Sequence, residues 1–255
     1  MPRNIRLVIE YDGTAYAGWQ MQENAPTIQA AVRDAILKVT GETVNLIGAG
    51  RTDAGVHALG QVANFLIEHS LGAARFADAI NFHLADNIRV LESDEVHEQF
   101  NARFDATWRR YRFLMSDQRS ALYRQRRWEH HYEIESDLLQ QAAALVVGEH
   151  DFAPFCVVAS RKESNLCEVF HSAWRQVGPL WVYEIRGNRF LHSMVRSLVG
   201  AMVNVATRNR DQNSLNLTID DLRSMLDGSN STRNPFTAPA HGLYLVSVGY
   251  PQTGK

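Results

Sequence analysis

The chain has 255 residues, of which 45% are hydrophobic and 21% charged, and its formal net charge at pH 7 is −2. These values are those of an ordinary soluble globular protein that can bury a core as one domain or as two compact halves. No apolar run reaches the roughly 18 residues of a membrane span and no apolar signal segment opens the chain, so we expect a cytoplasmic protein. The two cysteines, Cys156 and Cys167, suit a reducing compartment, and neither belongs to a CxxC pair. A metal site or a disulfide framework is therefore not expected.

The average charge hides a basic segment. Residues 103–127 contain eight arginines and two aspartates, a net charge of +6, so the rest of the chain totals −8. A confined basic segment on an acidic body is typical of a surface that binds a polyanion, although a solvated strand and loop would give the same composition. Arginine supplies 23 of the 26 basic side chains, and its planar guanidinium suits phosphates and base stacking.

The first hundred residues predict an α+β layer with both helices on one face of a sheet. Alternating apolar residues indicate a strand at 5–11, and a helix follows between the capping residue Thr27 and Gly41. Further strands are predicted at 44–47, 61–67 and 87–91, and a second amphipathic helix at 71–80.

A glycine-rich loop lies between the strands at 44–47 and 61–67. Residues 48–60 include four glycines, which allow unusual backbone conformations and the close approach of another segment. The loop also carries a cation, a carboxylate and an imidazole: Arg51, Asp53 and His57. Such clusters are often only solvated turns. Here the flanking strands would hold the carboxylate on a scaffold, which favours a functional site.

The second half begins with a strong strand signal at 107–115. Arg109 and Tyr111 lie on one face of this strand, and Arg110 lies on the other. A tyrosine between arginines suits base stacking beside phosphate contacts, although a core tyrosine has the same pattern. Residues 117–135 predict a loop that continues the basic face. The remaining predicted elements are a helix at 137–148, a hairpin of strands at 168–177 and 180–186, helices at 191–205 and 218–228, and a strand from 243.

The helix at 191–205 is the most apolar in the chain, and Arg196 lies off its apolar stripe. An unpaired buried charge is expensive, so this arginine needs a partner. Asp53 would satisfy it, and so would a helix terminus elsewhere.

Five motifs, in order along the chain, resemble the tRNA pseudouridine synthase A (TruA) family. They are Y-D-G-T-x-Y-x-G-W-Q at 11–20, G-R-T-D-A-G-V-H-A-L-G-Q at 50–61, F-x-A-R-F…R-R-Y-R-F at 100–113, F-L-H-x-M-V-R at 190–196 and A-P-x-x-G-L-x-L at 238–245. The resemblance implies two ferredoxin-like (RRM-like) α+β halves, 1–104 and 105–255. It also implies a mixed, mostly antiparallel central sheet, helices on the outer face and a catalytic cleft between the halves.

The resemblance further implies an isomerase that converts uridine to pseudouridine in the anticodon stem-loop of tRNA, at family positions 38, 39 and 40, without metal or cofactor. It makes Asp53 the nucleophile, Arg196 its paired cation and Tyr111 the residue that stacks on the uracil and is a candidate proton acceptor. Whether Asp53 attacks C1′ or the base, or takes a proton from the ribose, stays open. His57 is expected to order the loop, and the family usually forms a homodimer with tRNA crossing both subunits. The implied substrate-binding residues are Arg51, Arg103, Arg109, Arg110, Tyr111, Ser160, Arg161 and Leu243; the match fades after Lys162.

Two other functions fit parts of the sequence. A non-catalytic RNA-binding module on an RRM-like scaffold would explain the basic segment and Tyr111, but the chain lacks an RNP1 string and the Asp53 loop would have no purpose. A metal-dependent hydrolase would use Asp53, His57 and the pair His150-Asp151. Its ligand spacing is poor, and we rank it last.

Overall fold

The structure is a computed structural model that describes residues 2–161, 163–208 and 216–251. The chain divides into two compact units: unit 1 comprises residues 1–108 and 244–255, and unit 2 comprises residues 109–243. The C-terminal segment therefore belongs with the N-terminal unit, whereas the sequence placed it in the half 105–255. None of the helices in the described part of the chain is long and apolar enough to cross a membrane.

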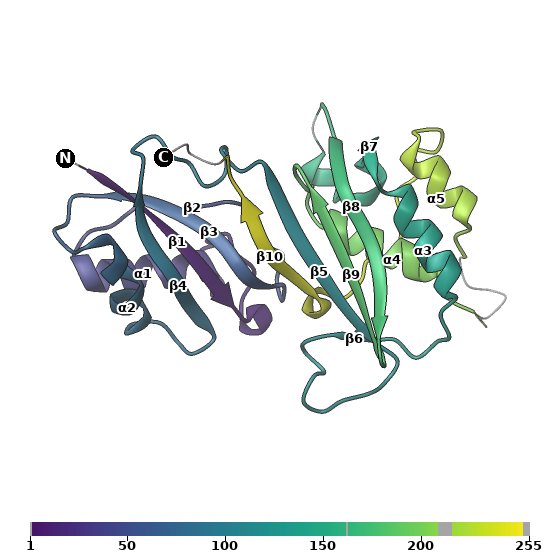
Figure 1. The fold of residues 1–255 in the computed structure, drawn as a ribbon, viewed down its shortest axis with the longest axis horizontal. Coiled ribbons are helices and arrows are strands. Elements are labelled where there is room, and N and C mark those ends of the chain that lie inside the picture. The colour runs from purple at the N-terminus through teal and green to yellow at the C-terminus, as the bar shows by residue number, and fades with distance from the viewer. Residues whose placement is uncertain (1, 162, 209–215, 252–255) are drawn as a thin grey trace. The chain divides into compact units, whose positions relative to one another are not determined.

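Unit 1 is a β-α-β-β-α-β fold to which one strand is added. Strand β1 pairs antiparallel with both β3 and β4, and β2 pairs antiparallel with β3, which gives the strand order β4-β1-β3-β2 of a ferredoxin-like fold. The added strand β10 runs parallel to β3. Helices α1 and α2 pack beside each other (Figure 1). The elements are β1 (Arg3–Tyr11), α1 (Ile28–Thr40), β2 (Ile47–Gly48), β3 (His57–Ile67), α2 (Phe76–Asn81), β4 (Ile88–Val96) and β10 (Leu243–Gly249).

The amphipathic patterns of unit 1 form the predicted core. Ile5, Leu7 and Ile9 alternate along β1 and are fully buried. The predicted helix at 27–41 is confirmed as α1, whose first turn is capped by the hydroxyl of Thr27, which accepts a hydrogen bond from the backbone N of Ala30.

The strands predicted at 61–67 and 87–91 are present but longer, as β3 and β4. Two other predicted elements of unit 1 differ in kind from the structure. The strand predicted at 44–47 is reduced to the two residues of β2, although Val44 and Leu46 are buried. The carbonyl of Leu46 accepts a hydrogen bond from Nε2 of Gln29 (2.8 Å) instead of joining a sheet ladder. The helix predicted at 71–80 is a 3₁₀ turn at Ala73–Arg75 followed by the short α2. The spacing of apolar residues predicts which side chains are buried, but it does not predict which backbone groups are hydrogen-bonded to each other.

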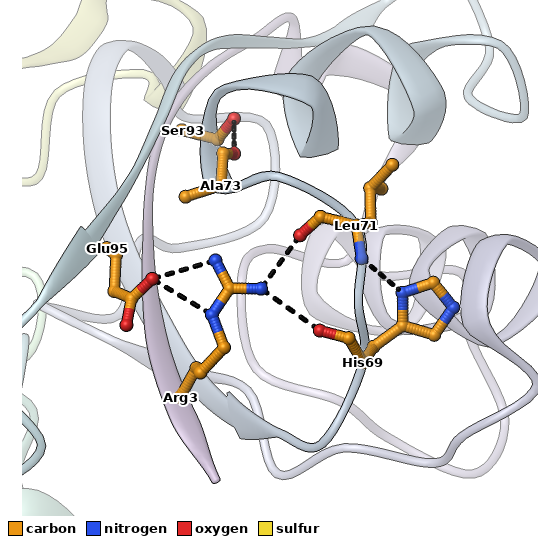
Figure 2. A network of polar contacts seen from close by, with 6 residues as sticks. All are labelled: Arg3, His69, Leu71, Ala73, Ser93 and Glu95. Carbon is orange, nitrogen blue, oxygen red and sulfur yellow. Dashed lines mark hydrogen bonds and ion pairs between the residues drawn. The ribbon is translucent and has the colours of Figure 1, made fainter. Parts of the chain in front are cut away.

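An arginine at the start of β1 holds the connection between β3 and α2. Figure 2 shows the Arg3 guanidinium donating to the carboxylate of Glu95 and to the carbonyls of His69 and Leu71. Ser93 of β4 fixes the next turn because its hydroxyl donates to the carbonyl of Ala73 (2.7 Å). These contacts set the short α2 against β4.

Unit 2 repeats part of the same topology. Strand β9 lies between β5 and β8, β7 pairs with β8, and all these pairs are antiparallel; β6 pairs parallel with β5. Helix α3 follows β5 and α4 follows β9, as the two helices of unit 1 follow β1 and β3. Helices α3, α4 and α5 pack on one another (Figure 1). The elements are β5 (Trp108–Ser116), β6 (Trp128–Glu129), α3 (Ser136–Leu145), β7 (Gly148–Asp151), β8 (Leu166–Val177), β9 (Leu180–Gly187), α4 (Met194–Ala206) and α5 (Ile219–Leu226).

The sequence predicted most of unit 2 closely. The strand at 107–115, the hairpin and the α5 helix with its Thr218–Asp221 capping box are confirmed. Helix α4 begins at Met194, three residues later than predicted, because Ser193 adopts a left-handed conformation (φ 60°) that no helix continues through. The α+β class and the mixed, mostly antiparallel strand pairing are confirmed.

Candidate active site

The glycine-rich loop of unit 1 is fixed to its surroundings immediately before Asp53. The carbonyl of Thr52 accepts a hydrogen bond from the backbone N of Trp19 (3.1 Å), and its buried hydroxyl lies 2.8 Å from the phenol oxygen of Tyr11. Nε2 of Gln61 donates to the carbonyl of Gly50 (2.8 Å). The backbone on this side of Asp53 is therefore held by both main-chain and side-chain contacts.

The loop is fixed after Asp53 as well. Its carbonyl accepts a hydrogen bond from the backbone N of Val56 (3.1 Å), which closes a tight turn, and the N–H of Gly55 donates to the carbonyl of Tyr16 (3.3 Å). The Asp53 side chain is half-buried. A carboxylate on a loop tied at both ends has the fixed position that chemistry requires.

The segment 13–19 packs directly against this loop. Gly18 has φ 94°, and a side chain there would run into the carbonyl of Thr52. A side chain at Gly13 would likewise meet the carbonyl of Val56. Both positions need glycine because the two backbones touch.

His57 joins the end of the loop to the turn after β1. The imidazole is 2% exposed, and its Nδ1 lies 3.1 Å from the backbone N of Gly13 and 3.0 Å from Oδ1 of Asp12. When Nδ1 carries no proton, it accepts a hydrogen bond from the backbone N of Gly13. When Nδ1 is protonated, it donates to the carboxylate of Asp12. The ring also stacks on Tyr244 of β10, with 4.8 Å between centroids. Asp12 lies inside the Y-D-G motif, and nothing in the sequence indicated that its carboxylate would contact His57.

The other predicted site residues of unit 1 lie at the surface. Arg51 is exposed on the same loop as Asp53. Arg103 is exposed on the segment before β5, and its guanidinium lies 5.6 Å from the ring centroid of Phe104, which is itself 77% exposed. This segment is anchored because Oδ1 of Asn64 accepts a hydrogen bond from the backbone N of Ala102 (2.9 Å).

In unit 2, Tyr111 belongs to the core face of β5. It is 7% exposed, and its ring meets Phe190 edge-on with 5.3 Å between centroids. Arg109 lies on the same face of the strand and donates to the carbonyl of Asn188 (2.9 Å). Arg110, on the opposite face, is half-buried. The predicted alternation is therefore confirmed, and Tyr111 is largely a packed side chain.

A salt bridge crosses from β5 to β9 beside this tyrosine. Arg112 and Glu184 face each other in the ladder, with 2.7 Å between Nη2 and Oε1. The Arg112 hydrogen bond holds the pKa of the Glu184 carboxyl below its usual range, against the smaller opposing effect of burial.

Arg196 is half-buried in the first turn of α4. Its Nε donates to the carbonyl of Ala238 (2.9 Å), and the backbone N of Ala238 donates to the carbonyl of Arg196 (3.0 Å). The segment bound in this way leads to Leu243, which is 5% exposed. A backbone carbonyl of its own unit is thus one partner of this arginine.

His241 lies in the same segment and was not singled out in the sequence. Burial lowers the pKa of His241 and Arg196 acts in the same direction, against the backbone of Arg127 and the carboxylate of Glu129. The family pattern leaves this position unspecified, so no sequence signal marked it.

Ser160 is the last residue of a 3₁₀ turn of unit 2 (Val158–Ser160), and Arg161 follows it. The Ser160 hydroxyl donates to the carbonyl of Val157 (2.7 Å), and Arg161 is exposed. Lys162 lies outside the described residues.

The residues of the hydrolase alternative have local structural contacts. His150 Nε2 lies 3.2 Å from the carbonyl of Val147, and Asp151 accepts a hydrogen bond from the backbone N of Ala153 (2.8 Å). Within 2–161, 163–208 and 216–251, no three His, Cys, Asp or Glu side chains gather closely enough to hold a metal ion.

Comparison with known proteins gives consistent similarities. A family model described as tRNA pseudouridine synthase matches residues 7–105 and 142–251. A tRNA pseudouridine synthase A of Acetivibrio thermocellus is 40% identical over 250 residues, covering 97% of this chain and all of the relative. Another of Chlorobium luteolum is also 40% identical, covering 98% of this chain and 96% of the relative. A chain in the crystal structure of an archaeal box H/ACA sRNP Nop10–Cbf5 complex is 11% identical with a TM-score of 0.37; the match covers 92% of this chain and 61% of that chain.

Proposed function

The chain belongs to the tRNA pseudouridine synthase family, a family of isomerases, and on that premise we propose that it isomerises uridine in the anticodon stem-loop of tRNA with Asp53 as the nucleophile. The observation that supports this role is the fixed backbone around a half-buried carboxylate. Thr52 and the Asp53–Val56 turn hold it on the two sides.

The residues named in this proposal supply every chemical group that the reaction needs. The N1–C1′ bond of the uridine breaks, the base turns, and a C5–C1′ bond forms; the hydrogen at C5 leaves as a proton and N1 takes one up, so the product is an isomer of uridine. A carboxylate can attack covalently or stabilise an oxocarbenium-like centre, as glycosidases do. A paired guanidinium balances the negative charge of such a carboxylate. We assign that task to Arg196.

The other residues of the proposed site bind the extruded base and the rest of the RNA. A base in a stem must leave its stack before it can react, and the gap and the extruded base both need partners. Arg51, exposed on the Asp53 loop, fills the gap, while Tyr111 and Leu243 contact the uracil and Tyr111 is the candidate proton acceptor. The remaining proposed RNA contacts are Arg103, Arg109, Arg110, Ser160 and Arg161. The family resemblance adds that the protein acts as a cytoplasmic homodimer, with one tRNA contacting both subunits.

Release of tritium from tRNA labelled at C5 of uridine tests the assignment. Asp53→Asn and Asp53→Ala should abolish the release and leave tRNA binding intact, because only the reacting carboxylate is removed. Asp86→Asn is the matched control, since its side chain is fully exposed on the same unit. Turnover retained by the Asp53 variants would refute the assignment.

A further inference from the structure

An exposed phenylalanine lies on the turn of unit 1 that precedes β5. The ring of Phe104 is 77% exposed, and the guanidinium carbon of Arg103 lies 5.6 Å from the ring centroid. At this distance the cation and the ring attract each other. Water solvates an apolar ring poorly, so a ligand that covers Phe104 gains free energy. A flat ring beside a guanidinium suits a nucleotide, whose base stacks on the ring while its phosphate pairs with the cation.

The turn that presents this ring is held by its own hydrogen bonds. Oδ1 of Asn101 accepts from the backbone N of Arg103 (3.0 Å) and from the backbone N of Phe104 (3.2 Å). The backbone N of Asn101 donates to Oδ2 of Asp105 (2.8 Å), and the backbone N of Asp105 donates to the carbonyl of Asn101 (3.0 Å). The backbone at Phe104 is therefore ordered before any ligand arrives, which reduces the entropy lost on binding.

The turn is also anchored beside the loop that carries Asp53. The backbone N of Ala102 donates to Oδ1 of Asn64 in β3 (2.9 Å). Ala102 is fully buried and belongs to the same apolar cluster as Ala49, the second residue of the glycine-rich loop. Asp53 follows Ala49 by four residues, which is at most about 14 Å of extended chain. An RNA that reaches Asp53 is therefore brought close to the Phe104 turn.

A second exposed phenylalanine of unit 1 lies in a different setting. Phe82 is 85% exposed at the C-terminal end of α2, and its ring meets the imidazole of His83 edge-on with 5.1 Å between centroids. Single exposed apolar side chains are ordinary on soluble proteins. Phe104 differs from Phe82 in that its ring meets a guanidinium and its turn is anchored beside Asp53. The setting, and not the exposure alone, points to a ligand.

We propose that Phe104 is a stacking platform for one unpaired base of the substrate RNA, with Arg103 beside the phosphate of the same strand. The inference rests on the proposed function, because that function supplies an RNA whose anticodon loop has unpaired bases. Every base has a flat face, so such a stack holds the RNA strand without selecting its sequence. Phe104 is therefore a substrate-binding residue, and it holds a base other than the uracil that reacts.

Binding of an anticodon stem-loop RNA to the full chain tests the stack. For Phe104→Ala, the Kd should rise by a factor of about 5 to 150, the range for one lost base–aromatic stack. Phe104→Leu should lose nearly as much, because leucine is apolar but has no ring, whereas Phe104→Trp should keep the wild-type affinity. Phe82→Ala is the control, and its Kd should equal that of the wild type. An unchanged Kd for Phe104→Ala overturns the proposal.

The salt dependence of binding distinguishes a stack from a charge contact. A lost phosphate contact makes the slope of log Kobs against log salt concentration shallower by about 0.7 to 0.9, whereas a ring releases no counterions. Phe104→Ala should therefore keep the wild-type slope while its Kd rises. A shallower slope would show that the lost affinity comes from a phosphate contact, and it would overturn the assignment to stacking.

Stem-loop RNAs that each lack one loop base identify the base that stacks. One abasic position should weaken binding to the wild type about as much as Phe104→Ala does, and it should cause no further loss in that variant. At every other position the loss should be the same in the wild type and in Phe104→Ala. If Phe104 had a merely structural role, the losses would add at every abasic position, and that result overturns the proposal.

These measurements report binding, so they are independent of the tritium test. Turnover retained by the Asp53 variants would refute the proposed function, whatever the affinity of Phe104→Ala. Inactive Asp53 variants together with an unchanged Kd for Phe104→Ala would refute the stacking platform alone.

Discussion

The glycine positions around Asp53 that least tolerate a side chain lie outside its own loop. The loop has four glycines, and they were the reason for singling it out in the sequence. Within the loop, a side chain at Gly50 would meet nothing within 4 Å, and one at Gly48 or Gly60 would meet the Trp19 ring or the carbonyl of Val246. A side chain at Gly18 would come closer still to a backbone atom, the carbonyl of Thr52. What fixes Asp53 is therefore the close approach of segment 13–19.

Replacing these two glycines by alanine should have opposite outcomes. Gly18→Ala introduces both a left-handed alanine and a backbone overlap, so we expect the free energy of unfolding to fall by at least about 2 kcal/mol and the activity to fall with it. Gly50→Ala should stay within about 0.5 kcal/mol of the wild type. Urea unfolding of both variants measures the difference, and equal stabilities would contradict the packing described for Gly18.

The sequence predicted site residues that lie together in one motif. It did not predict residues whose contacts join two segments far apart in the chain. Asp53, Arg51 and His57 were visible because they share one loop. The contacts of Tyr11 with Thr52 and of Asp12 with His57 join segments about forty residues apart, and no periodicity reports such pairs. Their roles could be seen only after β1 and β3 were paired.

Strands and helices were predicted well where the apolar pattern coincided with a capping or turn residue. The capped helices α1 and α5 and the hairpin of β8 and β9 had both. Residues 44–47 had the apolar pattern alone, and a side-chain bond from Gln29 satisfies the carbonyl that a strand would have paired. The late start of α4 depends on the backbone of Ser193, which has no compositional signal.

The pairing of β5 with β9 should depend on pH through Glu184. Its pKa in the folded state is lowered chiefly by Arg112, so the stabilisation is present above the unfolded-state pKa and is lost as the pH falls through the folded-state value. Glu184→Gln should cost about 1 kcal/mol at pH 7, a value kept small because the pair is partly exposed. The deficit should shrink as the pH drops below about 4.

Urea unfolding of the wild type and Glu184→Gln at several pH values measures this dependence. Glu168→Gln, which alters an exposed carboxylate on neighbouring β8, should leave stability nearly constant. If the loss of stability in Glu184→Gln persists undiminished at acid pH, then the shape of the side chain, and not its charge, accounts for that loss.

The division of the chain into units was the hardest feature to derive from sequence. The α+β pattern of each half was visible, and a strand from residue 243 was expected. Which sheet this strand joins depends on long-range pairing, and the structure places Tyr244 opposite His57 of β3. The carbonyl of Gly249 also accepts a hydrogen bond from Thr107 (2.8 Å), and the Tyr250 hydroxyl donates to the carbonyl of Ala102 (2.7 Å).

Ending the chain after Leu243 should therefore damage unit 1. Hydrogen exchange followed by mass spectrometry should show lost protection in β3, because β10 no longer pairs with it, while the β8–β9 hairpin of unit 2 stays protected. A chain that ends after Pro251 keeps all of these contacts and serves as the control. Undiminished protection of β3 in the shorter chain would contradict the assignment of β10 to unit 1.

The place of β10 has a consequence for synthesis on the ribosome. Domains commonly fold in the order in which they emerge, but here the first residues to emerge must wait for the last strand to be translated. Unit 2 is synthesised before β10, so in the nascent N-terminal sheet the start of β3 lacks its parallel partner until β10 emerges. Unpaired edges invite association with other chains, and the N-terminal sheet is therefore most exposed to such association in the interval before β10 emerges.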